Sequence, residues 1–218
     1  AMRLTHLGHS CLFVEIADRR LLIDPGGWSA DFEDLTDLDA ILVTHQHADH
    51  LDTKRLKGVL ERNSGAALYT DPQTAAILAA DGLAASVLRQ GEDLTFGEVS
   101  VSPRGAKHAF NHDGVPTVDN VGVLVTAAGE SRLFHPGDAY DAPVEDVDIL
   151  AVPINAPWAA VRDSIDFVRN VAPRAMVPIH DGLLAPPGRN LYLTHVLTYG
   201  GRDQVTLHDL AGQGSVSA

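Results

Sequence analysis

The sequence predicts an α/β layered domain in which one sheet stacks on another and helices lie outside. Short apolar segments of strand length form two runs, and each run is followed by segments of helical character. The chain is 45% hydrophobic but only 6% aromatic, which predicts an aliphatic core of ordinary size. No linker or repeat divides the chain, so a single domain is expected over residues 2–218. Ala1, which precedes Met2, is interpreted as a residue added for expression.

The first run of strands begins with RLTHL, CLFVEI and RLLID, which are separated by the turn-forming segments 8–10 and 18–19. AILVT at 40–44 is continuously apolar, as expected of a buried strand, and ALYT follows at 67–70. Two helices accompany these strands, and both have terminal signals. Asp52 or Thr53 caps the helix at 53–62, and Asp71 caps the helix at 72–80, which Pro72 opens and Gly82 follows.

The second run contains more strands and two further helices. Apolar segments predict strands at 94–96, 98–103, 120–126, 132–136, 148–153, 175–180 and 204–210. Helices are expected at about 164–170 and 191–199. The last residues, LAGQGSVSA, are rich in turn formers and are expected to fray.

Charge and cysteine content exclude several classes of protein. The formal charge of −13 argues against a nucleic-acid partner, because phosphate backbones are bound by clusters of lysine and arginine. No apolar run is long enough to cross a membrane, and no secretory signal opens the chain. Cys11 is the only cysteine, which favours a reducing cytoplasm. A small-molecule substrate is the expected partner, and a homo-oligomer stays an open alternative.

Side chains that bind metals follow four of the expected strands. His45 follows 40–44, His108 follows 98–103, Asp138 follows 132–136, and His180 ends 175–180. A site built from loops on a rigid scaffold explains why such donors recur at strand ends.

The segment THQHADH at 44–50 carries the densest cluster of these donors. In an extended loop His45 and His47 point to one side and hold one ion, while Asp49 and His50 aim at a second. Zinc takes about four ligands, so more distant donors are required. The candidates are His108, with His112 as its rival, for the first ion; His180 for the second; and Asp138 as a bridge. Two ions about 3.5–4 Å apart can share one hydroxide.

In these motifs the chain resembles the metallo-β-lactamase fold superfamily. The resemblance rests on Asp24 in LLIDPG, on the H-x-H-x-D-H motif, and on His108, Asp138 and His180 in that order. The opening LTHLGHSCLFVE is similar to the compact cytoplasmic branch of metal-dependent hydrolases related to ascorbate-lactone hydrolases. The resemblance implies a four-layer αβ/βα sandwich with the metal site at one edge between the two sheets. Asp24 is expected to fix the segment 44–50, called the metal loop below, by hydrogen bonds.

The expected function is a dinuclear metal-dependent hydrolase in which a bridging hydroxide attacks a small ester, lactone or phosphodiester. Two divalent ions are expected, zinc first, with manganese or iron as alternatives. Asp49 is expected to orient the nucleophile as well as to bind metal. Proton delivery is assigned to His9, Tyr140 or water, and His9 either faces the site or is a turn histidine. The alternative function is a non-enzymatic metal-binding sensor or scaffold.

Other residues near the motifs have two interpretations. His135 either hydrogen-bonds a ligand or packs in its strand. Loop aromatic residues either line a pocket or cover the core; they are Trp28, Phe110, Tyr140 and Trp158.

Overall fold

Side chains alternate along each strand and so divide the core into layers. In β2 (Leu12–Ile16), Leu12 and Val14 belong to a central apolar cluster, whereas Phe13 belongs to a second cluster on the opposite face. Strands of the other sheet alternate between the central cluster and a third one in the same way. The central cluster therefore lies between two sheets, and each sheet keeps an outer apolar face.

The computed structural model describes residues 1–218 and contains two seven-stranded sheets. The first sheet has the spatial order β14 (Ser215–Ser217), β1 (Arg3–His6), β2, β3 (Arg19–Ile23), β4 (Ala40–Val43), β5 (Ala67–Thr70) and β6 (Ser86–Val87). The second sheet has the order β13 (Thr206–Leu207), β12 (Ala175–Ile179), β11 (Ile149–Pro153), β10 (Leu133–His135), β9 (Gly122–Thr126), β8 (Val99–Arg104) and β7 (Leu94–Phe96). In each sheet a meander of antiparallel strands continues into parallel strands.

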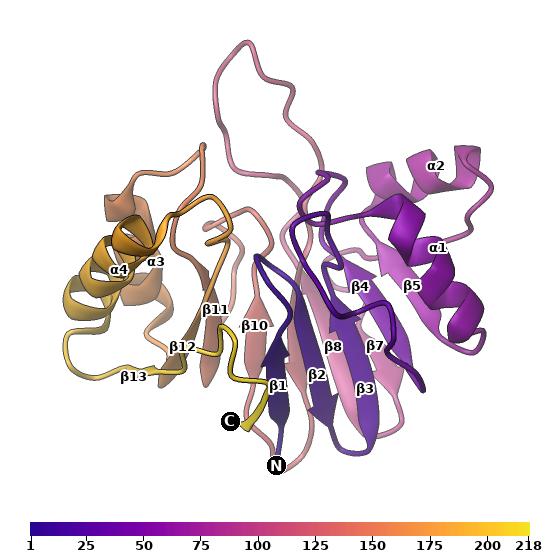
Figure 1. Cartoon of the computed structure of the whole chain (residues 1–218), viewed down its shortest axis with the longest axis horizontal. Coiled ribbons are helices and arrows are strands. Elements are labelled where there is room, and N and C mark those ends of the chain that lie inside the picture. Colours follow the sequence, from indigo (N-terminus) through magenta and orange to yellow (C-terminus); the bar gives the residue numbers. More distant parts are fainter.

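Two pairs of helices cover the outer faces. Helices α1 (Thr53–Arg62) and α2 (Pro72–Ala80) pack on the first sheet, and α3 (Val161–Val171) and α4 (Pro186–His195) pack on the second (Figure 1). A turn of π-helix, Val196–Gly201, extends α4. The order helix, sheet, sheet, helix confirms the predicted four-layer αβ/βα sandwich.

The predicted helix starts in the first half are confirmed by their caps. The Asp52 carboxylate accepts a hydrogen bond from Arg55 N at 3.0 Å, and Asp71 accepts one from Thr74 N at 2.9 Å. Each bond satisfies a backbone N–H that a helix leaves without an internal partner.

Several element boundaries differ from the sequence prediction. The expected fraying tail is wrong, because Ser215–Ser217 pairs with β1 and gives its edge a hydrogen-bonded neighbour. The last helix begins at Pro186, since proline is tolerated in a first helical turn. Helix α3 begins at Val161, where Asp163 accepts a hydrogen bond from Ala160 N at 2.7 Å. The two-residue strand β6 is too short to leave a periodic signal.

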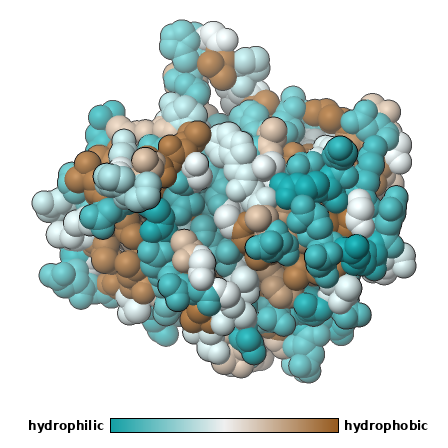
Figure 2. Space-filling model, viewed as in Figure 1, coloured by the Kyte–Doolittle hydropathy of each residue, from teal (hydrophilic) through white to brown (hydrophobic).

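The loops that follow β1, β4, β8, β10, β11 and β12 leave the sandwich at one edge, opposite the two chain termini (Figure 1). The loop after β8 projects farthest at this edge. No helix is both long and apolar enough to cross a membrane. Hydrophilic residues dominate the face in Figure 2, with apolar residues scattered between them.

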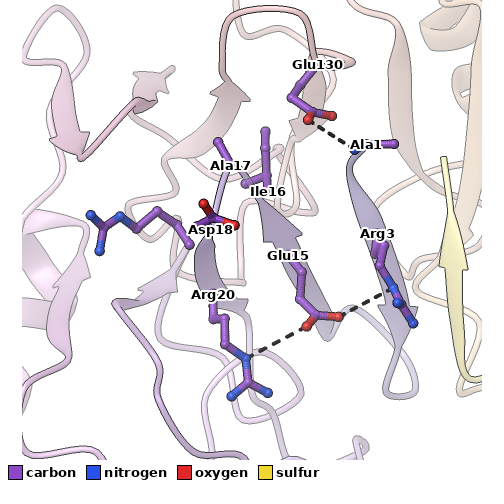
Figure 3. A pocket seen from close by; sticks show the side chains of 9 residues that line it. Ala1, Arg3, Glu15, Ile16, Ala17, Asp18, Arg20 and Glu130 are labelled. Atoms are coloured by element: carbon purple, nitrogen blue, oxygen red, sulfur yellow. Dashed lines mark ion pairs between the residues drawn. The ribbon is translucent and has the colours of Figure 1, made fainter.

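A hollow of about 450 Å³ beside β1–β3 is lined by charged side chains of both signs (Figure 3). Glu15 lies 3.9 Å from the guanidinium groups of Arg3 and Arg20. These charges compensate one another, and the hollow contains none of the predicted metal ligands.

Candidate metal centre

The predicted donors meet at the edge where the six loops emerge. Strand β1 leads to His9, β4 to His45, His47, Asp49 and His50, β8 to His108, β10 to Asp138, and β12 to His180. Their ligand atoms form two groups, and within each group all such atoms lie within 4.8 Å of one another. Residues distant in sequence converge because the strands that lead to them run in the same direction within each sheet and end at the same edge.

The first group contains His45, His47, His108 and Asp138. His45 Nε2 lies 3.1 Å from His47 Nδ1, and His108 Nε2 lies 3.3 Å from Asp138 Oδ2. The rival of His108 is not part of this group: His112 is exposed, and its Nδ1 accepts a hydrogen bond from Gly114 N at 2.9 Å.

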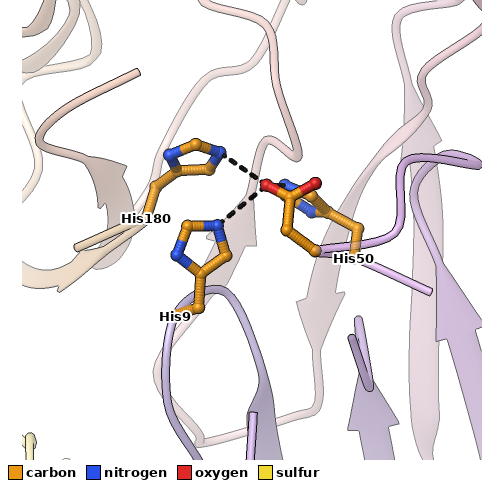
Figure 4. Close-up of side chains that lie close together, drawn as sticks. His9, His50 and His180 are labelled. Atoms are coloured by element: carbon orange, nitrogen blue, oxygen red, sulfur yellow. Dashed lines mark hydrogen bonds and ion pairs between the residues drawn. The ribbon is translucent and has the colours of Figure 1, made fainter. Parts of the chain in front are cut away.

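The second group contains His9, Asp49, His50 and His180 (Figure 4). Asp49 Oδ2 is the common neighbour, at 2.9 Å from His9 Nε2, 3.3 Å from His180 Nε2 and 3.6 Å from His50 Nε2. All three imidazoles are buried, whereas Asp49 is partly open to solvent.

Asp138 lies between the two groups. Its Oδ1 is 3.0 Å from His50 Nε2, and its Oδ2 is 3.3 Å from His108 Nε2 and 3.2 Å from His180 Nε2. The backbone around it is held by Asn120, whose side chain accepts a hydrogen bond from Asp138 N and donates one to Pro136 O, both at 3.0 Å. A carboxylate in this position can contact ions in both groups.

Three histidines are oriented by hydrogen bonds on the side of the ring away from the site. His50 Nδ1 donates to Asp24 Oδ2 at 2.7 Å. His108 Nδ1 donates to Ala109 O at 2.7 Å. His180 Nδ1 donates to Asn155 O at 2.6 Å. A neutral imidazole has one N–H, so in its neutral form each of these rings directs an unprotonated Nε2 into the site.

Asp24 stabilises the metal loop as the sequence predicted. Its carboxylate accepts hydrogen bonds from Thr44 N and Thr44 Oγ1, both at 2.7 Å, in addition to the bond from His50. Asp24 is fully buried and has a φ of +50°, so the loop that presents it is tightly constrained.

Charges inside the site shift several pKa values. Burial lowers the pKa of His45 and of His47, which keeps both rings neutral and able to bind metal. Burial also disfavours a charged His180, but the nearby Asp138 carboxylate outweighs the effect of burial. The pKa of His180 is therefore raised to about 9. The pKa of His50 is raised in the same way by Asp138 and Asp24. Despite burial, these imidazoles hold the pKa of Asp138 well below its usual range.

The donor set fits divalent metal ions. Half of the eight buried side-chain atoms without a hydrogen-bond partner lie together in the site: His50 Nε2, His108 Nε2, His180 Nε2 and Asp138 Oδ1. Buried polar atoms are rarely left unpaired, and a metal ion would supply the missing partner for all four. Imidazole nitrogen and carboxylate oxygen are ligands that zinc, manganese and iron accept.

Two aromatic residues border the groups. Trp158 Nε1 donates a hydrogen bond to Asp138 Oδ2 at 2.9 Å, and the Trp28 ring stands edge-on to His9 with a centroid distance of 4.7 Å. The contact between Trp158 and Asp138 was not predicted from the sequence, because it depends on how the loop after β11 returns over the site.

Tyr140 does not reach the reactive atoms. Its hydroxyl donates to Pro153 O and lies 2.8 Å from Ser164 Oγ, so it is no source of a proton for the site. His135 contacts no predicted ligand: its Nε2 donates to Ser10 O at 2.8 Å and its Nδ1 accepts from Gly137 N at 3.1 Å. Its role is to connect the loops that carry His9 and Asp138.

Known proteins are similar to this chain in sequence. Protein Rv0786c of Mycobacterium tuberculosis is 45% identical over 209 residues, which cover 95% of this chain and 94% of that protein. A UPF0173 metal-dependent hydrolase of Carboxydothermus hydrogenoformans is 30% identical over 194 residues, 82% of this chain and 84% of that protein.

Solved structures show the same fold. The metallo-β-lactamase fold protein YhfI from Bacillus subtilis matches with a TM-score of 0.71 at 17% identity, over 95% of this chain and 96% of that one. The isothiocyanate hydrolase from Delia radicum gut bacteria matches with a TM-score of 0.72 at 18% identity, over 99% of both chains.

The family model of the β-lactamase superfamily domain matches residues 3–180 of this chain. This range includes every residue of the two donor groups. Together with the sandwich fold and the hydrolase relatives, this match identifies the chain as a metal-dependent hydrolase of the metallo-β-lactamase superfamily.

Proposed function

We propose that the chain is a dinuclear hydrolase in which the first ion is held by His45, His47 and His108 and the second by Asp49, His50 and His180, with Asp138 shared. The observation that carries this proposal is the position of Asp138, whose two oxygens lie 3.0 Å from His50 Nε2 and 3.3 Å from His108 Nε2. Zinc is the expected metal, and manganese or iron also suit these ligands.

Bound divalent ions supply a nucleophile at neutral pH, because they lower the pKa of water toward about 7, and they polarise the bond under attack. The residues of the chain hold the reacting groups in position. Asp49 is partly open to solvent and orients the nucleophile toward the substrate. His9 donates to Asp49 and so contributes to the catalytic arrangement.

The surroundings of the site favour an uncharged ester or lactone over a phosphodiester. Large apolar side chains are exposed on the loops beside the donors: Trp28 is 49% exposed, Phe110 64% and Leu183 55%. The cations that adjoin these loops are engaged elsewhere: Arg55 with Asp52 and Glu33, Lys107 with Asp119, and Arg189 with Asp181 and Asp209. We therefore expect an apolar group on the substrate.

The test combines metal analysis with a substrate panel. Protein purified without chelator is expected to contain close to two transition-metal ions per chain. It is expected to hydrolyse aryl esters or lactones, more efficiently as the acyl chain lengthens. The panel also includes a bis-phosphodiester and an isothiocyanate, the substrate class named for one structural neighbour. A chain that takes up no metal even after loading with zinc or manganese would refute the proposal, and metal without turnover of any substrate would favour a sensor.

Acidification is expected to release the ions below about pH 5, because histidine binds metal only when neutral and its ordinary pKa is about 6.5. Lower pH protonates the imidazoles of the site, and each protonated ring loses the lone pair that would bind an ion. Ions and turnover should return on neutralisation with added metal. Equilibrium dialysis followed by elemental analysis measures this release, and full metal retention at about pH 4 would contradict a histidine-dominated site.

A further inference from the structure

His9 differs from the other histidines of its group in how its two ring nitrogens are used. Its Nδ1 accepts a hydrogen bond from the backbone N–H of Gly182 at 3.1 Å. Its Nε2 lies 2.9 Å from Asp49 Oδ2 (Figure 4). A neutral imidazole has a single N–H. Because Nδ1 is the acceptor, the proton is on Nε2, which donates it to the Asp49 carboxylate.

His50 and His180 have the opposite arrangement. In both rings Nδ1 is the donor, to Asp24 Oδ2 and to Asn155 O, and Nε2 keeps its lone pair for an ion. Metal ligands need that free lone pair. The Nε2 of His9 carries a hydrogen in place of the lone pair, although it lies as close to Asp49 as any ligand atom of the group.

The protein holds the His9 ring in this orientation from several directions. The residue is 1% exposed and has a φ of +51°. Its carbonyl accepts hydrogen bonds from His180 N at 3.0 Å and from His6 Nε2 at 2.8 Å. Gly182 is needed for the approach, since a Cβ there would lie 2.9 Å from His9 Nδ1. The turn that carries His9 is thus fixed to the loop that carries His180.

We propose that His9 is a positioning residue for Asp49 and not a ligand of the second ion. Its Nε2–H occupies one lone pair of Asp49 Oδ2 and fixes the rotation of the carboxylate. The remaining lone pairs stay available to the ion that His50 and His180 bind. This inference rests on the dinuclear function proposed above, and it removes one donor from a group that geometry alone would assign to the metal.

The first test compares matched substitutions. In His9→Gln the side-chain amide can donate to Asp49 and accept from Gly182, whereas His9→Ala can do neither. His180→Gln makes the same change at a proposed ligand, and His112→Gln makes it at an exposed histidine outside the site. Affinity for the second zinc ion is measured by chelator competition. We expect H9Q and H112Q to stay within a few-fold of the wild type, and H9A and H180Q to lose about 10- to 100-fold, the scale for groups that orient or bind metals.

The second test is spectroscopic and uses the unaltered protein. Histidine is labelled with ¹⁵N and the protein is loaded with ¹¹³Cd²⁺, with H9Q identifying the His9 signals. We expect a nitrogen–cadmium coupling in the ligand histidines, and at His9 a protonated Nε2 without such a coupling. A coupling at His9, or loss of the second ion in H9Q as severe as in H180Q, would overturn the inference. A wild-type chain that takes up only one ion would instead remove the dinuclear proposal itself, and the inference with it.

Discussion

Replacing Asp138 by alanine is expected to leave a folded protein with one tightly held ion and to lower turnover by about 10²–10³-fold, the scale for loss of one preorganised electrostatic contact. The physical reason is that Asp138 contacts both donor groups, within 3.3 Å of His50, His108 and His180. His45, His47 and His108 still hold the first ion, whereas the second loses a carboxylate and its fixed distance from the first. Metal stoichiometry, melting temperature and turnover are measured on the same sample.

The matched control is Asp141→Ala, which removes an exposed carboxylate three residues away. It should retain both ions and normal turnover. If Asp138 only stabilised the turn after Gly137, its alanine variant would lose about 1 kcal/mol of stability, as for a typical cap, and would retain both metals. Two ions and near-normal turnover in D138A would therefore refute the shared position of this carboxylate.

Gly26→Ala is expected to abolish metal binding and to lower the melting temperature strongly. The added Cβ would overlap the carbonyl of Asp49 and would lie 2.7 Å from His50 N. These are backbone atoms of the metal loop and cannot rotate away as a side chain would. Overpacking of this kind costs about 1–3 kcal/mol or more, and relief requires the loop with Asp49 and His50 to move.

Gly58→Ala is the control for this substitution. A Cβ at Gly58 meets no atom within 4 Å, and the residue lies inside α1. Alanine there should raise the free energy of unfolding by about 0.5–1 kcal/mol, because glycine weakens a helix interior, and should leave the metals in place. Thermal unfolding with elemental analysis compares the two variants. A G26A protein that retains two ions would show that the metal loop tolerates displacement.

The residues that could be predicted from the sequence are those whose position follows from a strand end. His45, His108, Asp138 and His180 each follow a strand, and the parallel directions of those strands bring them together at one edge. The H-x-H-x-D-H motif also predicted His47, Asp49 and His50. The two-sheet sandwich followed from the order of strands and helices, although the short strands β6 and β14 left no signal.

The contacts that could not be predicted depend on the path of loops. Trp158 reaches Asp138 only because the segment after β11 folds back over the site, and nothing in its spacing indicates this. Asn120 holds the Asp138 backbone from a residue that reads as part of an apolar strand. The orientation of His9 follows from the backbone N–H of Gly182, 173 positions away in the chain. Such hydrogen bonds are properties of tertiary structure and have no local pattern.

Both tryptophans of the chain border the donor groups, and the sequence contains no others. Trp28 stands against His9, and Trp158 donates to Asp138, so each indole lies beside a different donor group. Intrinsic emission excited at the indole band should therefore report almost entirely on this edge of the sandwich. Single-tryptophan variants, in which phenylalanine replaces one indole, would separate the two signals during a titration with metal. The protein thus carries its own optical probes of occupancy, and the order in which the ions bind becomes observable without an attached dye.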